Sequence, residues 1–142
     1  MPSISRDMLE ISRCASQFRA ERLAPLGLKS CHASYLVEVC KEPGISQDQL
    51  AQRICINKSN VARQVAFLEE AGYLNRCTCK EDKRVTELTP TQKALDALPE
   101  IRQILADWRN MLTEELTEEE QDALVTILDK LRNKASEWME NH

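Results

Sequence analysis

Apolar residues recur every three or four positions over long stretches at both ends of the chain, a spacing that places them on one face of an α-helix. We therefore expect helices over residues 4–22 and 30–42, the second of which is stopped by Pro43 and Gly44. Two longer helices should occupy the last third of the chain. Pro99 falls inside the first of these two, where a kink or a break is expected because proline lacks the N–H donor. The apolar positions of the two long helices are Leu95, Leu98, Leu105, Trp108 and Leu112, then Leu124, Leu128, Leu131, Ala135 and Trp138.

Short polar patterns mark where three of the helices should begin. Residues 46–49, 89–92 and 117–120 each match a capping box, in which a Ser or Thr and a Glu or Gln three residues later satisfy each other's backbone N–H groups. In the second pattern Pro90 would occupy the first helical position, where its missing N–H costs nothing. Asn57 is expected to cap a further helix that runs to residue 71. The inner face of that helix carries Val61, Val65 and Leu68.

Residues 73–88 follow a different pattern. Apolar and polar side chains alternate imperfectly around an all-charged centre, which fits two short strands joined by a loop. Two helices joined by a tight turn within residues 46–72, followed by such a ribbon, form a winged helix-turn-helix, an arrangement that reads DNA. The expected fold is therefore mainly α with a small β-hairpin wing. Its expected parts are an N-terminal dimerisation helix at 1–28, a winged helix-turn-helix core at 29–95 with the recognition helix at about 57–72 and the wing at about 73–88, and C-terminal dimerisation helices at 96–142.

The composition favours a single soluble domain. A chain of 142 residues, 42% of them hydrophobic, has room for one sizeable core. No stretch approaches the roughly 18 consecutive apolar residues that a membrane-spanning helix needs. The first residues lack the apolar segment of a secretory signal. We therefore expect a cytoplasmic protein, in which the six cysteines are reduced thiols rather than disulfides.

The formal net charge of −4 argues mildly against a nucleic-acid partner until its distribution is considered. Residues 46–95 contain 8 Lys/Arg and 6 Asp/Glu, whereas residues 96–142 contain 5 and 12. The acidity therefore belongs to the C-terminal third, and the winged core is mildly basic. Because binding depends on the local potential, DNA is the expected partner of the core.

The expected recognition helix presents polar side chains on the face opposite Val61. They are suited to base edges and phosphates, and a small alanine among them can lie against a thymine methyl group. The acidic Glu69 and Glu70 come only at the far end of the helix, away from the N-terminal half that enters a major groove. The alternative is an ordinary solvated face. The candidate DNA-binding residues of this helix are Asn57, Lys58, Ser59, Asn60, Ala62 and Arg63.

The tip of the ribbon offers a second set of candidate DNA contacts. A hairpin tip is thin enough for a narrow minor groove, which arginine enters best. Asp82 can orient the guanidinium of Arg84 through paired hydrogen bonds. The alternative is a hairpin tip that is merely solvated. The candidate wing residues are Lys80, Asp82, Lys83 and Arg84.

Several short motifs follow one another through this core. They are Ser46, Leu50-Ala51, Ser59-x-Val61-x-Arg63-x-Val65, Leu68-Glu69-x-x-Gly72-Tyr73-Leu74-x-Arg76, Asp82-x-Arg84 and Leu88-Thr89. In this order and spacing, residues 44–95 resemble the winged-helix core of the MarR family of bacterial transcription regulators. The family usually has glycine where this chain has Gln92, to which the second capping box gives a local role.

The resemblance implies a homodimer, held by the first helix and the last two, that represses a palindromic operator. It also implies release of the DNA by a small phenolic or other anionic ligand, or in some members by thiol oxidation. Family pockets lie where the first two helices meet the winged core. The candidate ligand contacts are therefore His32, Ser34 and Tyr35.

The residues themselves also favour a dimer. The terminal helices carry more apolar surface than the winged core can cover, and two-fold symmetry suits DNA half-sites that lie about one turn apart. The alternative is that these helices pack on the core of their own chain.

The cysteines receive different assignments. Cys40 and Cys55 lie next to apolar helix positions, where packing explains them. Cys77 and Cys79 alternate along a strand beside basic residues, so both thiols can share one face and their thiolate forms are favoured. These two are candidate redox thiols, against the alternative that they are incidental. Neither a metal site nor a cofactor is indicated, because C-x-C lacks the usual zinc spacing.

Two other functional classes compete with a DNA-binding repressor. A winged helix can bind protein rather than DNA, and the acidic C-terminal third is compatible with that role. An enzyme is disfavoured because the sequence has two histidines, no glycine-rich phosphate loop and no cluster of catalytic side chains. Steep salt dependence would separate DNA binding from protein binding.

Overall fold

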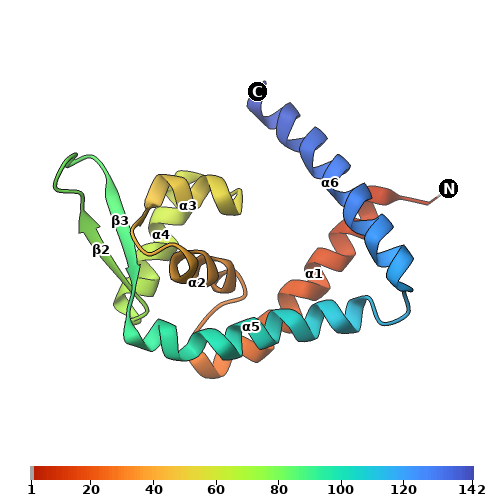
Figure 1. Cartoon of the computed structure of the whole chain (residues 1–142), viewed down its shortest axis with the longest axis horizontal. Coiled ribbons are helices and arrows are strands. Elements are labelled where there is room, and N and C mark those ends of the chain that lie inside the picture. The colour runs from red at the N-terminus through yellow and green to blue at the C-terminus, as the bar shows by residue number, and fades with distance from the viewer. Residues whose placement is uncertain (1) are drawn as a thin grey trace. The chain divides into compact units, whose positions relative to one another are not determined.

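The chain begins with the two helices that its periodicity predicts. The computed structural model describes residues 2–142, and helices α1 (Ile4–Leu23) and α2 (His32–Lys41) flank the short 3-10 helix η1 (Ala24–Leu26) (Figure 1). Ser3 caps α1 by accepting a hydrogen bond from the Arg6 N–H at 3.3 Å. Gly27, at φ 72°, adopts the left-handed conformation that ends η1.

Helices α3 (Gln47–Ile54) and α4 (Lys58–Glu70) form the expected helix-turn-helix. The capping box of α3 is present in both directions, between Ser46 and Gln49. Asn57 caps α4 by accepting from the Asn60 N–H at 2.8 Å. These boundaries agree with the sequence because each cap uses partners only three residues apart.

The wing is part of a three-stranded antiparallel sheet rather than an isolated two-stranded ribbon. Strands β2 (Leu74–Thr78) and β3 (Thr86–Pro90) pair as expected, and β1 (Ile45–Ser46) adds to the free edge of β3. The sequence pattern misses β1 because two residues are too short to show alternation. Ser46 is therefore both the last residue of a strand and the cap of α3.

The start of α5 (Gln92–Leu112) corrects the second predicted capping box. Pro90 ends strand β3 opposite Leu74 and so does not occupy the first turn of the helix. Thr91 caps instead of Thr89, because its hydroxyl oxygen accepts from the Ala94 N–H at 3.3 Å. Pairing with β2 keeps Thr89 and Pro90 extended, and this non-local constraint outweighs the local capping signal.

Of the kink or break expected at Pro99, the break is absent, because helix α5 continues through this residue. Buried residues lie on both sides of the proline, at Ala94, Ile101 and Ile104, each at most 1% exposed. Their burial stabilises the helix on either side of the missing N–H donor. Helix α6 (Glu118–Glu140) follows, and its predicted capping box between Thr117 and Glu120 is present.

The described chain divides into two compact units, one reaching to Ala106 and one comprising Asp107–His142. The first unit holds an aliphatic core beneath α4 and the sheet. Its fully buried members include Leu36, Val39, Leu50, Val61, Val65, Leu68 and Leu88. His32 is the one polar residue among the buried side chains of residues 2–142.

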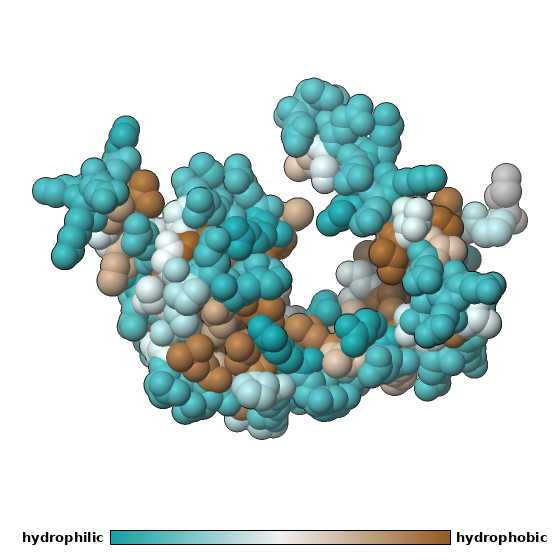
Figure 2. Space-filling model, in the orientation of Figure 1, coloured by the Kyte–Doolittle hydropathy of each residue, from teal (hydrophilic) through white to brown (hydrophobic). Residues whose placement is uncertain are grey.

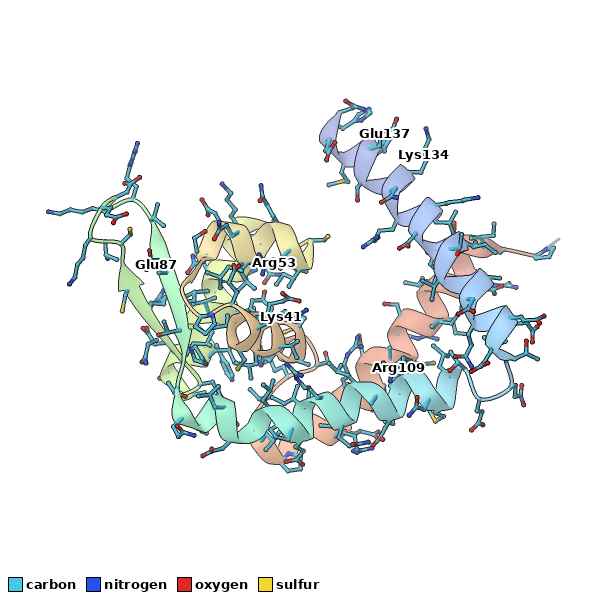
Figure 3. The ribbon with its side chains drawn as sticks, viewed as in Figure 1. Lys41, Arg53, Glu87, Arg109, Lys134 and Glu137 are labelled. Atoms are coloured by element: carbon cyan, nitrogen blue, oxygen red, sulfur yellow. The ribbon has the colours of Figure 1, made fainter. Side chains whose placement is uncertain are left out.

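Two helices expose their apolar faces to solvent. In α1, Ile4, Met8 and Ile11 are 66%, 48% and 47% exposed. Helix α6 has no buried residue, and ion pairs along its polar side include Lys134 with Glu137 (Figure 3). None of the described helices combines the length and the apolar content needed to cross a membrane. The exposed apolar residues of α6 are Leu124, Val125, Ile127, Leu128, Leu131, Trp138 and Met139.

Candidate nucleic-acid interface

Helix α4 has one buried face and one open face, as its periodicity predicts. Val61, Val65 and Leu68 are fully buried against the core. Ser59 and Arg63 are exposed on the other side of the helix. Asn60 and Ala62 lie at the flanks and are half-buried. The N-terminal half of α4 therefore presents a short row of polar groups on a rigid support.

Asn57 shapes the start of this helix. Its side-chain oxygen accepts from the Asn60 N–H at 2.8 Å and from the Ser59 hydroxyl at 2.9 Å. Two of the acceptor positions of that oxygen are thus occupied within the protein. Asn57 holds the first turn in place and fixes the rotamer of Ser59, a role that the sequence predicts only in its capping part.

The two cations of the helix differ in their surroundings. Lys58 Nζ lies 3.4 Å from Asp48 Oδ2 on α3, and both side chains are well exposed. An exposed pair of this kind contributes little, so the ammonium group can exchange its carboxylate for a phosphate. The Arg63 guanidinium makes a long contact of 3.5 Å to Asn60 Oδ1 and otherwise reaches outward.

The wing tip is hydrophilic (Figure 2) and holds its arginine in a defined orientation. Asp82 accepts from the Arg84 backbone N–H at 3.0 Å, from Nε at 3.1 Å and from Nη2 at 3.3 Å. These hydrogen bonds lower the pKa of the Asp82 carboxyl group. The Arg84 side chain is nonetheless 90% exposed. The paired hydrogen bonds expected of these two residues are therefore present, and Lys80 and Lys83 are exposed beside them.

A second arginine ties the wing to the end of α4, which sequence reasoning did not foresee. Arg76 on β2 donates from Nη2 and Nε to Glu69 Oε1 at 2.9 and 3.2 Å, and its backbone N–H donates to Oε2 at 3.3 Å. The hydrogen bonds from Arg76 lower the pKa of Glu69. Seven residues separate the two, so only the turn at Gly72 brings them together.

A cavity of about 310 Å³ lies within the first unit, between α1, α2, the end of α3 and α5. Its lining is mixed and contains both polar and aliphatic residues. Ser34 and Tyr35, both predicted, are among the lining residues. The residues missed from sequence include Arg19 and Ser16, which share one face of α1 at a spacing of three. The full lining is Ser16, Arg19, Ser30, Cys31, Ala33, Ser34, Tyr35, Ile54, Ile56 and Leu105.

His32, the third predicted ligand contact, is not among the residues that line the cavity. Its side chain is fully buried. One ring nitrogen accepts from the Lys29 N–H at 2.9 Å, and the other lies 2.8 Å from Gln64 Oε1 on α4. Burial lowers the pKa of the imidazole, which is therefore neutral at pH 7.

All six cysteines are free thiols. Cys40 is half-buried and packs against the core, as expected. Cys55 is exposed, so packing does not explain it; it ends α3 in a left-handed conformation, at φ 58°. Cys77 is exposed opposite Glu87 on β3, which Figure 3 labels, and Cys79 is half-buried. The role of these two as redox thiols stays a prediction.

No group of three or more His, Cys, Asp or Glu side chains within residues 2–142 is arranged to hold a metal ion. The surface of α4 and the wing offers hydrogen-bond donors, acceptors and cations. Such groups recognise phosphates and base edges.

The chain is similar to known proteins along most of its length. The model of the MarR family matches residues 31–86. The HTH-type transcriptional regulator BilQ from Clostridium symbiosum is 30% identical over 118 residues, which cover 83% of this chain and 78% of that protein.

Solved structures share the architecture as well. The MarR protein from Peptoclostridium difficile is 26% identical with a TM-score of 0.94, covering 100% of this chain and 94% of that one. A MarR family transcriptional regulator from Listeria monocytogenes, crystallised in complex with a 26mer DNA, is 27% identical with a TM-score of 0.90. That match covers 98% of this chain and 93% of the Listeria chain.

Proposed function

Since the chain belongs to the MarR family of DNA-binding transcription regulators, we propose that it is a homodimeric repressor that releases a palindromic operator when a small molecule binds. Its family consists of regulators and not of enzymes, so its surface is to be understood as a binding surface. The observation that carries the proposal is the open N-terminal half of α4, backed by three buried side chains.

In this proposal α4 enters the major groove and the wing approaches the adjacent minor groove. Lys58, Ser59, Asn60, Ala62 and Arg63 face the bases and phosphates, and Asn57 supports them through the cap. Arg84, oriented by Asp82, enters the minor groove beside Lys80 and Lys83. The crystal structure of the Listeria relative in complex with a 26mer DNA supports DNA as the partner.

The dimer is proposed from the exposed apolar faces of α1 and α6. The apolar face of α6 exposes Leu124, Leu128, Leu131 and Trp138, and Leu128 is 44% exposed. Packing against a second copy would remove this apolar surface from water. Each Å² buried would contribute about 25 cal/mol of favourable free energy to association. Two-fold symmetry then presents two copies of α4 to two half-sites, which is why the operator should be palindromic.

We assign the dimer contacts and the DNA contacts to separate parts of the chain, with the boundaries predicted from the sequence. Residues 1–28 and 96–142 carry the dimer contacts, and residues 29–95 carry the DNA contacts. The acidic stretch after residue 96 belongs to the dimer helices, so it does not oppose DNA binding by the mildly basic core.

The effector is proposed to bind in the cavity beneath α2. Its lining combines Arg19 with Ser34 and Tyr35 and with three aliphatic residues, Ile54, Ile56 and Leu105. That combination suits a small aromatic acid, whose carboxylate pairs with arginine and whose ring packs on the aliphatic wall. The volume of about 310 Å³ lies at the small end of the range for ligand pockets.

Binding to the DNA upstream of the protein's own gene tests the proposal. We expect the protein to prefer that fragment to random duplex, with an affinity that falls steeply as salt is raised. Arg63→Ala should weaken specific binding by about 1–3 kcal/mol. Arg132→Ala, which removes the same charge from α6, should leave binding unchanged. Equal affinity for both duplexes at physiological salt would contradict the repressor.

Release by effectors is tested on the same complex. Simple aromatic acids such as salicylate should dissociate the wild-type complex, and Arg19→Met should respond more weakly because the carboxylate loses its cation. Release of the Arg19→Met complex at the wild-type concentration would exclude this cavity as the carboxylate site.

A further inference from the structure

His32 joins the wall of the cavity to the middle of the recognition helix. It is the first residue of α2 and is fully buried. Its neighbours in the chain, Cys31 and Ala33, line the cavity on one side. On the other side its Nε2 lies 2.8 Å from Oε1 of Gln64, the residue that follows Arg63 on α4.

The hydrogen bonds of the ring fix its protonation state. Nδ1 accepts from the Lys29 backbone N–H at 2.9 Å, so this nitrogen carries no proton. Nε2 faces an amide oxygen, which can only accept, so this nitrogen carries the proton. The imidazole is thus neutral, with one nitrogen as donor and the other as acceptor.

Aromatic packing restricts the ring further. The His32 and Phe67 rings are stacked, with centroids 4.9 Å apart and planes 20° apart. Tyr35, one turn along α2, meets the imidazole edge-on at 6.3 Å. Lys29 Nζ lies 4.8 Å from the centroid of the same Phe67 ring. Gln64 and Phe67 lie three residues apart on one side of α4, so His32 contacts two successive turns of that helix.

A second proton would break this arrangement. It would have to enter at Nδ1, where the Lys29 N–H already points, and the new charge would lie near the Lys29 ammonium group. The titratable groups around the ring are Lys29 before α2 and Cys31 and Tyr35 at the start of α2; α4 contributes the uncharged Gln64 and Phe67. None of these is an acid that would compensate the charge at neutral pH.

We propose that His32 is a positioning residue for DNA recognition: in its neutral form it fixes α4 through the Nε2–H donor to Gln64 and links the cavity wall to that helix. This inference rests on the proposed DNA-reading role of α4. It adds the contact through which acidification would alter operator affinity.

Two substitutions at residue 32 separate the hydrogen bond to Gln64 from the hydrogen bond with the Lys29 N–H. In His32→Gln the longer amide can still donate to Gln64, whereas in His32→Asn the shorter amide can accept only from the Lys29 N–H. The probe is a labelled duplex selected by the wild-type protein from a randomised pool at pH 7.5. We expect His32→Asn to lose about tenfold in affinity and His32→Gln to stay within about threefold of wild type. Circular dichroism of each variant shows whether it is folded.

A double-mutant cycle tests whether Gln64 transmits the effect. Gln64→Met keeps the volume of the side chain but removes the acceptor, so it should weaken binding about as much as His32→Asn. The double variant should bind no more weakly than either single variant, because both remove the same contact. Additive losses would show that the two residues act separately and would overturn the inference.

The pH profile gives a readout that a purely structural role would not change. The chain's two histidines are His32 and His142, so in His142→Gln the imidazole NMR signals belong to His32 alone. We expect a neutral ring protonated at Nε2 at pH 7, and an acid limb of DNA affinity whose midpoint coincides with the pKa of that ring. His32→Gln should lack this limb. A limb common to both proteins, or absent from both, would contradict the need for a neutral imidazole.

Failure of this inference can be told from failure of the proposed function. If Arg63→Ala weakens binding as expected while His32→Asn binds like wild type, α4 reads DNA without help from His32. If the wild-type protein selects no duplex at all, the repressor and the positioning role are both excluded.

Discussion

At the scale of single residues, the structure separates side chains that periodicity can place from those that only the fold can place. Arg63 faces outward because Val61 and Val65 face inward, which a helical wheel predicts. The partner of His32 lies 32 residues away, and no local pattern indicates it. Cys55 is misassigned from sequence because its apolar neighbours suggest packing, whereas the side chain is exposed and the backbone adopts a left-handed conformation.

Cys55 is a site at which the fold is strained. Its φ of 58° and ψ of 43° lie in the left-handed region, which favours glycine. We expect Cys55→Gly to raise the free energy of unfolding by roughly 0.5–1 kcal/mol, since relief of the Cβ strain exceeds the entropy that glycine adds to the unfolded chain. Urea titration at a fixed protein concentration measures this change. Cys55→Ala retains the Cβ atom and should give no gain; an equal gain would point to the thiol instead.

His32 also predicts how stability depends on pH. Its pKa in the folded protein is below the ordinary value of 6.5, so the unfolded chain binds the proton more readily. The contribution of the neutral His32 ring to the free energy of unfolding is therefore complete above pH 6.5. It declines as the pH falls from there toward the pKa of the ring in the folded state. Thermal unfolding between pH 7.5 and 5 should show this slope in wild type and a flatter one in His32→Gln. Equal slopes would assign the pH dependence to other groups.

At the scale of elements, local signals fix the helices and non-local pairing fixes the sheet. Asn57, Ser46 and Thr117 were identifiable as caps because their partners lie three residues ahead. Strand β1 and the extended state of Pro90 depend on pairing with β3 and β2, which no window of sequence contains. Continuity of α5 across Pro99 likewise depends on buried contacts with the core.

The start of α5 gives a direct test of the corrected cap. Thr91 accepts from the Ala94 N–H and donates to the Gly72 carbonyl oxygen, so it joins the helix to the turn after α4. Thr91→Val should lower the free energy of unfolding by about 1–2 kcal/mol. Thr89→Val, the matched change at the position first expected to cap, should cost less than about 0.5 kcal/mol. Urea titration of both variants compares them, and the reverse order would restore Thr89 as the cap.

At the scale of the whole molecule, the sequence predicts the class of fold and the outward face of α4, while the cavity and the links between elements come from the structure. The cavity brings together residues from four helices, and the link from Arg76 to Glu69 depends on the turn at Gly72. The apolar faces of α1 and α6 were visible in the sequence. Burial of these faces, which are exposed in the single chain, is the driving force of the proposed dimer.

The oligomeric state of variants tests whether the apolar face of α6 holds the proposed dimer. Leu131 lies on the apolar face of α6 and is 42% exposed in the single chain, whereas Asn133 lies on the opposite face by helical spacing. Leu131→Lys should shift the protein from dimer to monomer at micromolar concentration, because the interface would have to bury an ammonium group from each copy. Asn133→Lys should remain dimeric. Sedimentation equilibrium distinguishes the two, and a monomeric wild type would exclude the dimer altogether.

The double use of Ser46 has a consequence for changes in chain length. One residue ends strand β1 and begins α3, so there is no spare loop between the sheet and the helix-turn-helix. Inserting a single residue between Ile45 and Ser46 would displace either the pairing of Ile45 with Leu88 or the Ser46 cap of α3 relative to the sheet, and both cannot be kept. The charged tip of the wing, by contrast, is an exposed connection that can vary in length without moving a strand. Natural variation and engineered insertions in this core should therefore be confined to the wing tip.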